Sequence, residues 1–99
     1  MRKLMIVQPI NGRLYQTMET ERAAAAQDAA DVLGEALDLL DRCGAPGEYF
    51  ERELEYLAEN LRQMAQADVV YFVHGWESTH LCRVLHDVAA SYDLLRLYG

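Results

Sequence analysis

VVYFV, residues 69–73, is the stretch that decides the fold, because all five residues are apolar and three are β-branched. A run this short favours a strand over a helix. It has no polar alternation, so we expect both faces of the strand to be covered, as in the central strand of a parallel sheet. Residues 3–8, KLMIVQ, show a similar apolar run before Pro9 and predict a second buried strand.

Helical periodicity lies between these strands. In the first helix, from about residue 17 to residue 33, one stripe includes Met18, Arg22, Ala25 and Ala29. Thr17 is the expected N-cap of this helix, and Gly34 its left-handed C-cap. Further helices are predicted for residues 49–66 and 79–92, and a last strand for residues 94–98.

Residues 36–40 have two interpretations, a short strand or an extension of the first helix, and Gly34 favours the strand. The order β-α-β-α-β-α-β then predicts one α/β domain over residues 1–99. We expect a small three-layer Rossmann-like domain with three helices and a four-stranded parallel sheet in the order 2-1-3-4. Ligands bind such sheets beyond the carboxyl ends of strands one and three. Residues 8–13 and 74–81 border that position.

Composition narrows the classes of function. The 52% apolar and 25% charged fractions are typical of a globular protein. The net charge of −7 argues against direct nucleic-acid binding, which needs clustered basic residues. No stretch is long enough for a membrane span or for the core of a signal peptide, so a cytoplasmic location is expected. Cys43 and Cys82 form no CxxC motif and are expected to be free thiols.

The segment from Asp28 to Glu59 carries ten acidic residues and two arginines, which leaves a local net charge of −8. It is either a solvated helical face or a docking surface for a basic partner. Glu51, Glu55 and Glu59 are the residues expected to bind such a partner.

The loop after the first strand contains Gln8, Pro9, Asn11, Gly12 and Arg13, which are candidate ligand-binding residues. Asn11 and Gly12 could present backbone N–H groups to an anion or simply form a tight turn. Arg13 could neutralise an anion or be a solvated surface residue.

The loop after the central strand adds His74, Gly75 and Trp76 as candidate ligand-binding residues. His74 has either a functional role or an ordinary place at a strand end. Trp76 could cover a flat ring, anchor a second subunit or pack within its own domain. Glu77 and His86 are weak candidates for acid–base catalysis.

A metal site is not expected, because His74, His80, Cys82 and His86 lack the spacing of common zinc ligands. We expect no cofactor either.

Several motifs together resemble the small nucleoside 2-deoxyribosyltransferase-like proteins that are common in bacteriophages and prophages. Residues 8–13, QPINGR, resemble the family's QPMNGK, and residues 67–89 resemble its ADxVYFxxGWexxxGCRIEHExA. The resemblance covers nearly the whole chain in order and spacing. It implies a Rossmann-like fold, self-association, for example as a homodimer, and binding of a nucleoside or nucleotide. Active members of the family use a glutamate near the start of the third helix as the nucleophile that attacks the anomeric carbon of the deoxyribose.

The chain departs from this pattern at the nucleophile. Leu81 stands in place of the family's glycine, and Leu85 in place of its glutamate. Asp87 is not a replacement, because two residues turn a helix by about 200°.

Three hypotheses about function follow. The first is a catalytically degenerate protein that binds a nucleotide-like ligand or a protein partner. The second is an acidic inhibitor or decoy of a basic partner such as a host-defence nucleoprotein. The third is an active N-glycosidic hydrolase or transferase acting on deoxynucleosides.

Overall fold

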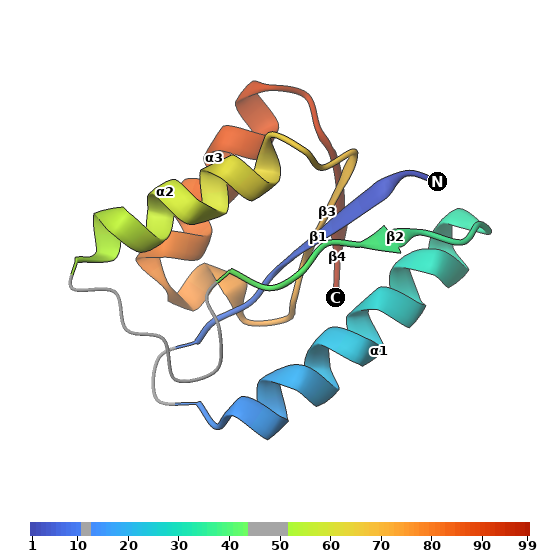
Figure 1. Cartoon of the computed structure of the whole chain (residues 1–99), viewed down its shortest axis with the longest axis horizontal. Coiled ribbons are helices and arrows are strands. Elements are labelled where there is room, and N and C mark those ends of the chain that lie inside the picture. The colour runs from blue at the N-terminus through green and yellow to red at the C-terminus, as the bar shows by residue number, and fades with distance from the viewer. Residues whose placement is uncertain (11–12, 44–51) are drawn as a thin grey trace.

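The computed structural model describes residues 1–10, 13–43 and 52–99. Strands and helices alternate along this part of the chain (Figure 1): β1 (Lys3–Val7), α1 (Tyr15–Leu33), β2 (Asp38–Leu39), α2 (Glu53–Met64), β3 (Val69–Phe72), the 3₁₀ turn η1 (Trp76–Ser78), α3 (His80–Ser91) and β4 (Leu95–Tyr98).

The four strands form one parallel sheet in the order β2-β1-β3-β4. β1 and β3 are the central strands, with Leu4 opposite Val69 and Val7 opposite Phe72. The predicted parallel sheet, its strand order and its three helices are confirmed.

Helices cover both faces of the sheet, with α1 on one face and α2 and α3 on the other (Figure 1). Alternate strand residues point to opposite faces. Leu4, Ile6 and Tyr71 pack with Ala25 and Ala29 of α1. The second core combines strand, α2 and α3 residues: Met5, Val7, Met64, Ala67, Val70, Phe72, Cys82, Leu85 and Ala89.

α1 differs from the prediction at its start. The helix begins at Tyr15 after Leu14, which forms no side-chain capping bond, and Thr17 lies inside the first turn instead of capping it. The far end is as predicted, because Gly34 has a left-handed φ of 67° and its N–H donates to the Ala30 carbonyl. A residue without a side chain accepts that conformation readily.

β2 settles the two interpretations of residues 36–40 in favour of a strand. It is only two residues long and pairs with the start of β1, Lys3 with Asp38 and Leu4 with Leu39. In α2, the described helix starts at Glu53 and ends at Met64. The predicted start at residue 49 lies outside the described residues, and the predicted end at residue 66 is two residues too late.

Candidate functional site

The loops after β1 and β3 meet at one edge of the sheet, termed here the carboxyl edge. The strands are parallel and in register, so Val7 and Phe72 end them side by side. The N–H of Val73 also donates to the Val7 carbonyl at 2.9 Å. Segments that are about 60 residues apart in sequence therefore share one surface, as expected for a sheet of this order.

A polar cluster attaches the loop after β1 to α1. Gln8 Nε2 donates to Glu21 Oε1 at 2.9 Å and to the Met18 carbonyl at 3.2 Å. The Arg13 guanidinium donates to both Glu21 carboxylate oxygens, at 2.8 and 2.9 Å, and to the Pro9 carbonyl at 3.0 Å. Three predicted ligand-binding residues thus lie together, but the charge of Arg13 is already compensated by Glu21.

Glu21 is a residue of this edge that sequence reasoning missed. It was one acid among several on an amphipathic helix, and only the path of the preceding loop brings Arg13 to it. Asn11 and Gly12, the other predicted ligand-binding residues of this loop, lie outside the described residues.

An aromatic cluster of four rings, Phe72, Trp76, His86 and Tyr98, gathers where β3 and β4 end. The rings of Trp76 and His86 stack with centroids 4.4 Å apart and 21° between planes. Phe72 meets His86 edge-on at 4.9 Å and stacks on Tyr98 at 5.8 Å. His86 Nε2 and Tyr98 Oη form a hydrogen bond of 2.7 Å. Tyr98 remains 51% exposed, so the cluster reaches the surface.

The turn between β3 and α3 exposes two other predicted side chains, His74 and Glu77. Gly75 has a φ of 90°, in the left-handed region that favours glycine. The backbone carbonyl of Glu77 accepts a hydrogen bond of 2.7 Å from Arg83. Among the described residues, no partner contacts the Glu77 carboxylate, which makes it a solvated group beside the aromatic cluster.

Leu85, which stands where the resembled pattern has a glutamate, is 1% exposed and belongs to the core beneath α3. Leu81 packs at the margin of the same core, and Asp87 is exposed. A carboxylate at this position would face apolar side chains rather than the carboxyl edge.

Arg22 is a buried charged residue outside the carboxyl edge to which sequence reasoning gave no role. It occupies a core-facing position in the α1 stripe, is only 6% exposed, and donates from Nη2 to the Leu40 carbonyl at 2.9 Å. Leu40 follows β2, and its N–H donates to the Leu4 carbonyl at 2.9 Å, so this contact lies beside the middle of β1 and not at the carboxyl edge. A charged residue within an otherwise apolar stripe is the sequence signal that could have identified it.

Neither cysteine is suited to nucleophilic chemistry at neutral pH. Burial is the main cause that raises the pKa of Cys43 to about 11, and burial also raises the pKa of Cys82. Only the thiolate is a strong nucleophile. Both thiols are free, as the sequence predicted. Within residues 1–10, 13–43 and 52–99, no three His, Cys, Asp or Glu side chains gather as metal ligands would.

The three acidic residues that are predicted to bind a partner differ in their surroundings. Glu55 is exposed near the start of α2, Glu59 forms an ion pair with Arg62, and Glu51 lies outside the described residues. Glu59 is therefore partly neutralised by its own helix.

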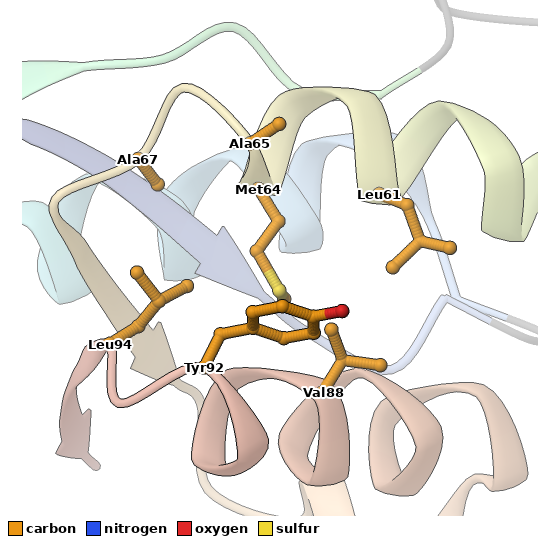
Figure 2. Close-up of a pocket in the computed structure, with 7 residues that line it drawn as sticks. All are labelled: Leu61, Met64, Ala65, Ala67, Val88, Tyr92 and Leu94. Atoms are coloured by element: carbon orange, nitrogen blue, oxygen red, sulfur yellow. The ribbon is translucent and has the colours of Figure 1, made fainter.

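A separate apolar groove, with a volume of about 410 Å³, lies between α2 and α3 (Figure 2). Its walls are Leu61, Met64, Ala65, Ala67, Val88, Tyr92 and Leu94. These residues are near the C-terminal ends of both helices and just before β3 and β4. The groove thus opens at the amino edge of the sheet, opposite the predicted site, and contains none of the predicted site residues.

No helix in the described part of the chain is long and apolar enough to cross a membrane. Comparisons with protein-family models, with curated proteins and with solved structures find no match to this chain. The functional assignment therefore rests on the residues themselves.

Proposed function

We propose that this chain is a nucleoside 2-deoxyribosyltransferase-like protein that binds a nucleotide-like small molecule at the carboxyl edge and lacks the family's transfer chemistry. The observation that carries the proposal is the aromatic cluster at the carboxyl edge, where β3 and β4 end. The loop after β1 and three of the four rings fall in the segments that resemble the family, residues 8–13 and 67–89, and Tyr98 lies beyond them. A cytoplasmic location and self-association belong to the same proposal.

The aromatic cluster has the chemistry that a nucleobase requires. Flat heterocycles stack on aromatic side chains, and each such contact contributes about 1 to 3 kcal/mol. Tyr98 offers an exposed ring, while the hydrogen bond between His86 and Tyr98 holds two rings in place. Polar groups at the rim, including His74 and Gln8, would set the orientation of a bound base.

The absence of transfer chemistry follows from the position of Leu85. Covalent glycosidic catalysis needs a carboxylate at the anomeric carbon. Leu85 has no such group and is buried. The two weak catalytic candidates are poorly placed for the role, because Glu77 is solvated and His86 is engaged by Trp76 and Tyr98.

Tryptophan fluorescence tests the binding proposal directly, since Trp76 is the one tryptophan of the chain. Titration with nucleosides and nucleotides should change its emission saturably and raise the midpoint of thermal unfolding. Tyr98→Ala should weaken binding, whereas Tyr92→Ala, which removes a tyrosine that is 77% exposed at the opposite edge of the sheet, serves as a matched control. If no nucleoside or nucleotide alters either signal, the proposal is wrong.

A separate assay tests whether the protein lacks the transfer chemistry. Incubation with deoxynucleosides, followed by chromatography, should release no free base. Release that is abolished by Glu77→Gln or by His86→Ala would instead establish an N-glycosidic enzyme.

A protein-binding function is the second candidate, and the exposed acids of α2 favour it. Glu53 and Glu55 are exposed at one end of the helix whose other end borders the apolar groove. Such a surface suits a basic, partly apolar partner, and in this version the protein acts as an inhibitor or decoy. Charge reversal of Glu55 and Glu59 should abolish binding to a basic amphipathic peptide, and Asp31→Lys on α1 is the control. Retained binding after reversal would exclude this function.

A further inference from the structure

The apolar groove between α2 and α3 continues into a longer apolar strip on the same side of both helices. Leu54, which is 61% exposed, lies seven residues before Leu61 of the groove wall, and this spacing places both on one side of α2. On α3, the half-buried Val84 lies one turn before Val88 of the wall. From Leu54 to the end of the groove the strip is about 16 Å long, which equals about three turns of a helix.

The walls of the groove leave room for an apolar segment. Figure 2 shows Leu61 and Met64 of α2 pointing toward Val88 and Tyr92 of α3. Of the described residues that line the groove, only Tyr92 carries a polar side-chain group. An elongated apolar groove between two helices suits the apolar face of a third helix, which places residues at i, i+3 or i+4 and i+7 into it.

Exposed acids border the groove along α3. Asp87 directly precedes Val88 of the wall, and Asp93 directly follows Tyr92. The buried Ala89 lies on one side of Val88, so Asp87 lies on the other side, at the solvent rim. Neither acid forms an ion pair within the described ranges. α3 also has no basic residue in its last turn, so the partial negative charge of its C-terminal end is not offset there.

The rim along α2 is acidic as well. Glu55 is exposed and directly follows Leu54 of the strip. Arg62, the basic residue next to Leu61, forms an ion pair with Glu59 and is thereby neutralised. Both rims of the apolar strip therefore present more negative than positive charge.

We propose that the groove between α2 and α3 binds an amphipathic helix of a basic protein partner. The apolar face of that helix fills the groove, and its lysines and arginines meet Asp87, Asp93 and Glu55. This inference rests on the second candidate function and makes it more specific. A second copy of this chain suits the groove less well, because its net charge is −7 and two-fold pairing would bring the same acids together.

The test uses fluorescence anisotropy with the full chain and two labelled synthetic peptides. The first peptide has about 14 residues, or about four helical turns, with leucines at i, i+3, i+4 and i+7 and lysines on both flanks. The second has the same composition in a scrambled order without a leucine stripe. We expect saturable binding of the first peptide, roughly tenfold tighter than that of the second, with a gain of helical circular dichroism.

Variants locate the binding surface. Ala65→Phe fills the groove from an exposed position and should weaken binding roughly tenfold, and Ala23→Phe at an exposed position of α1 is its control. Asp87→Lys should weaken binding by a similar factor, with Asp31→Lys on α1 as its control. Asp93→Asn should have a smaller effect, since asparagine accepts the left-handed φ of 56° and only the charge is lost.

The outcomes separate this inference from the functions proposed above. If both peptides bind equally and reversal of Glu55 and Glu59 abolishes the binding, the inference is wrong but the second candidate function stands. Binding that Ala65→Phe leaves unchanged also overturns the inference. If neither peptide binds, both are wrong, whereas the ligand at the carboxyl edge keeps its own test. A dimer that Ala65→Phe dissociates, without peptide binding, would assign the groove to a second copy and overturn the inference.

Discussion

The two edges of the sheet differ in chemistry although the same strands end at both. The carboxyl edge brings together polar and aromatic side chains that are linked by hydrogen bonds, such as Arg13 with Glu21 and His86 with Tyr98. The groove at the amino edge has a well-defined volume, but its one polar side-chain group is the hydroxyl of Tyr92 (Figure 2). Small-molecule sites combine an apolar surface with a few convergent polar groups. The mixture of polar and aromatic side chains therefore favours the carboxyl edge as the candidate site. The groove has a defined volume, but it lacks the polar groups that would orient a ligand.

The largest expected effect tests the position of Leu85, which lies in the same core as Phe72 of the aromatic cluster. Leu85→Glu should lower the free energy of unfolding by about 4 kcal/mol, because it buries a carboxyl group among apolar side chains. Urea denaturation measures this loss. Leu85→Met, which keeps volume and polarity, should cost less than about 1.5 kcal/mol.

The same variant has a distinctive pH dependence. Burial should raise the pKa of the introduced carboxyl above its unfolded value of about 4.3. The destabilisation is then smaller at about pH 3, where the group is largely protonated in both states, than at about pH 7. A stable variant that releases free base from deoxynucleosides would contradict this account and show that position 85 reaches the ligand.

Substitutions at the floor and at the rim of the apolar groove should have a smaller effect on the free energy of unfolding. Met64, which is 4% exposed, forms the floor, and Tyr92, which is 77% exposed, lies at the rim. Met64→Ala should lower the free energy of unfolding by about 2 to 4 kcal/mol, and Tyr92→Ala should change it by less than about 0.5 kcal/mol. Equal losses in thermal denaturation would mean that the groove is closed over Tyr92 rather than open.

The smallest effect concerns the polar cluster at the carboxyl edge. Glu21→Gln should lower the free energy of unfolding by about 1 kcal/mol at about pH 7, because the ion pair with Arg13 is partly exposed. Burial raises the pKa of Glu21, but the hydrogen bonds from Arg13 and Gln8 outweigh it, so the pKa is lowered from 4.5. A lowered pKa stabilises the folded state above the unfolded pKa, and this contribution disappears as pH falls through the folded value.

Urea titrations at about pH 7 and about pH 3 should therefore show a difference between wild type and Glu21→Gln only at the higher pH. Asp31→Asn is the control. Asp31 is an exposed acid on the same helix that accepts a hydrogen bond from Gln27, and it forms no ion pair with an arginine among the described residues. A difference that persists in acid would show that Glu21 acts through packing instead of charge.

Much of the fold was predictable because it depends on local patterns. The apolar run at residues 69–73 and the alternation of strands with helices predicted the sheet order correctly. The start of α1 was not predictable from its capping residue, since the helix begins at Tyr15 and places Thr17 inside its first turn. The site was predictable only as a location, namely the edge where β1 and β3 end.

The sequence alone determined which strands are buried, the order of the sheet and the presence of leucine at position 85. The buried strands follow from the hydrophobic pattern, and the sheet order follows from right-handed connections between parallel strands. The residue at position 85 is read directly from the sequence. Only the tertiary structure decided which side chains contact one another. It joined Arg13 to Glu21, stacked Trp76 on His86, placed Leu85 in the core, and left Arg22 buried with a carbonyl as its hydrogen-bond partner. Such contacts depend on distances between segments that are far apart in the sequence. Whether a charged side chain meets an opposite charge is therefore decided only when those segments pack together.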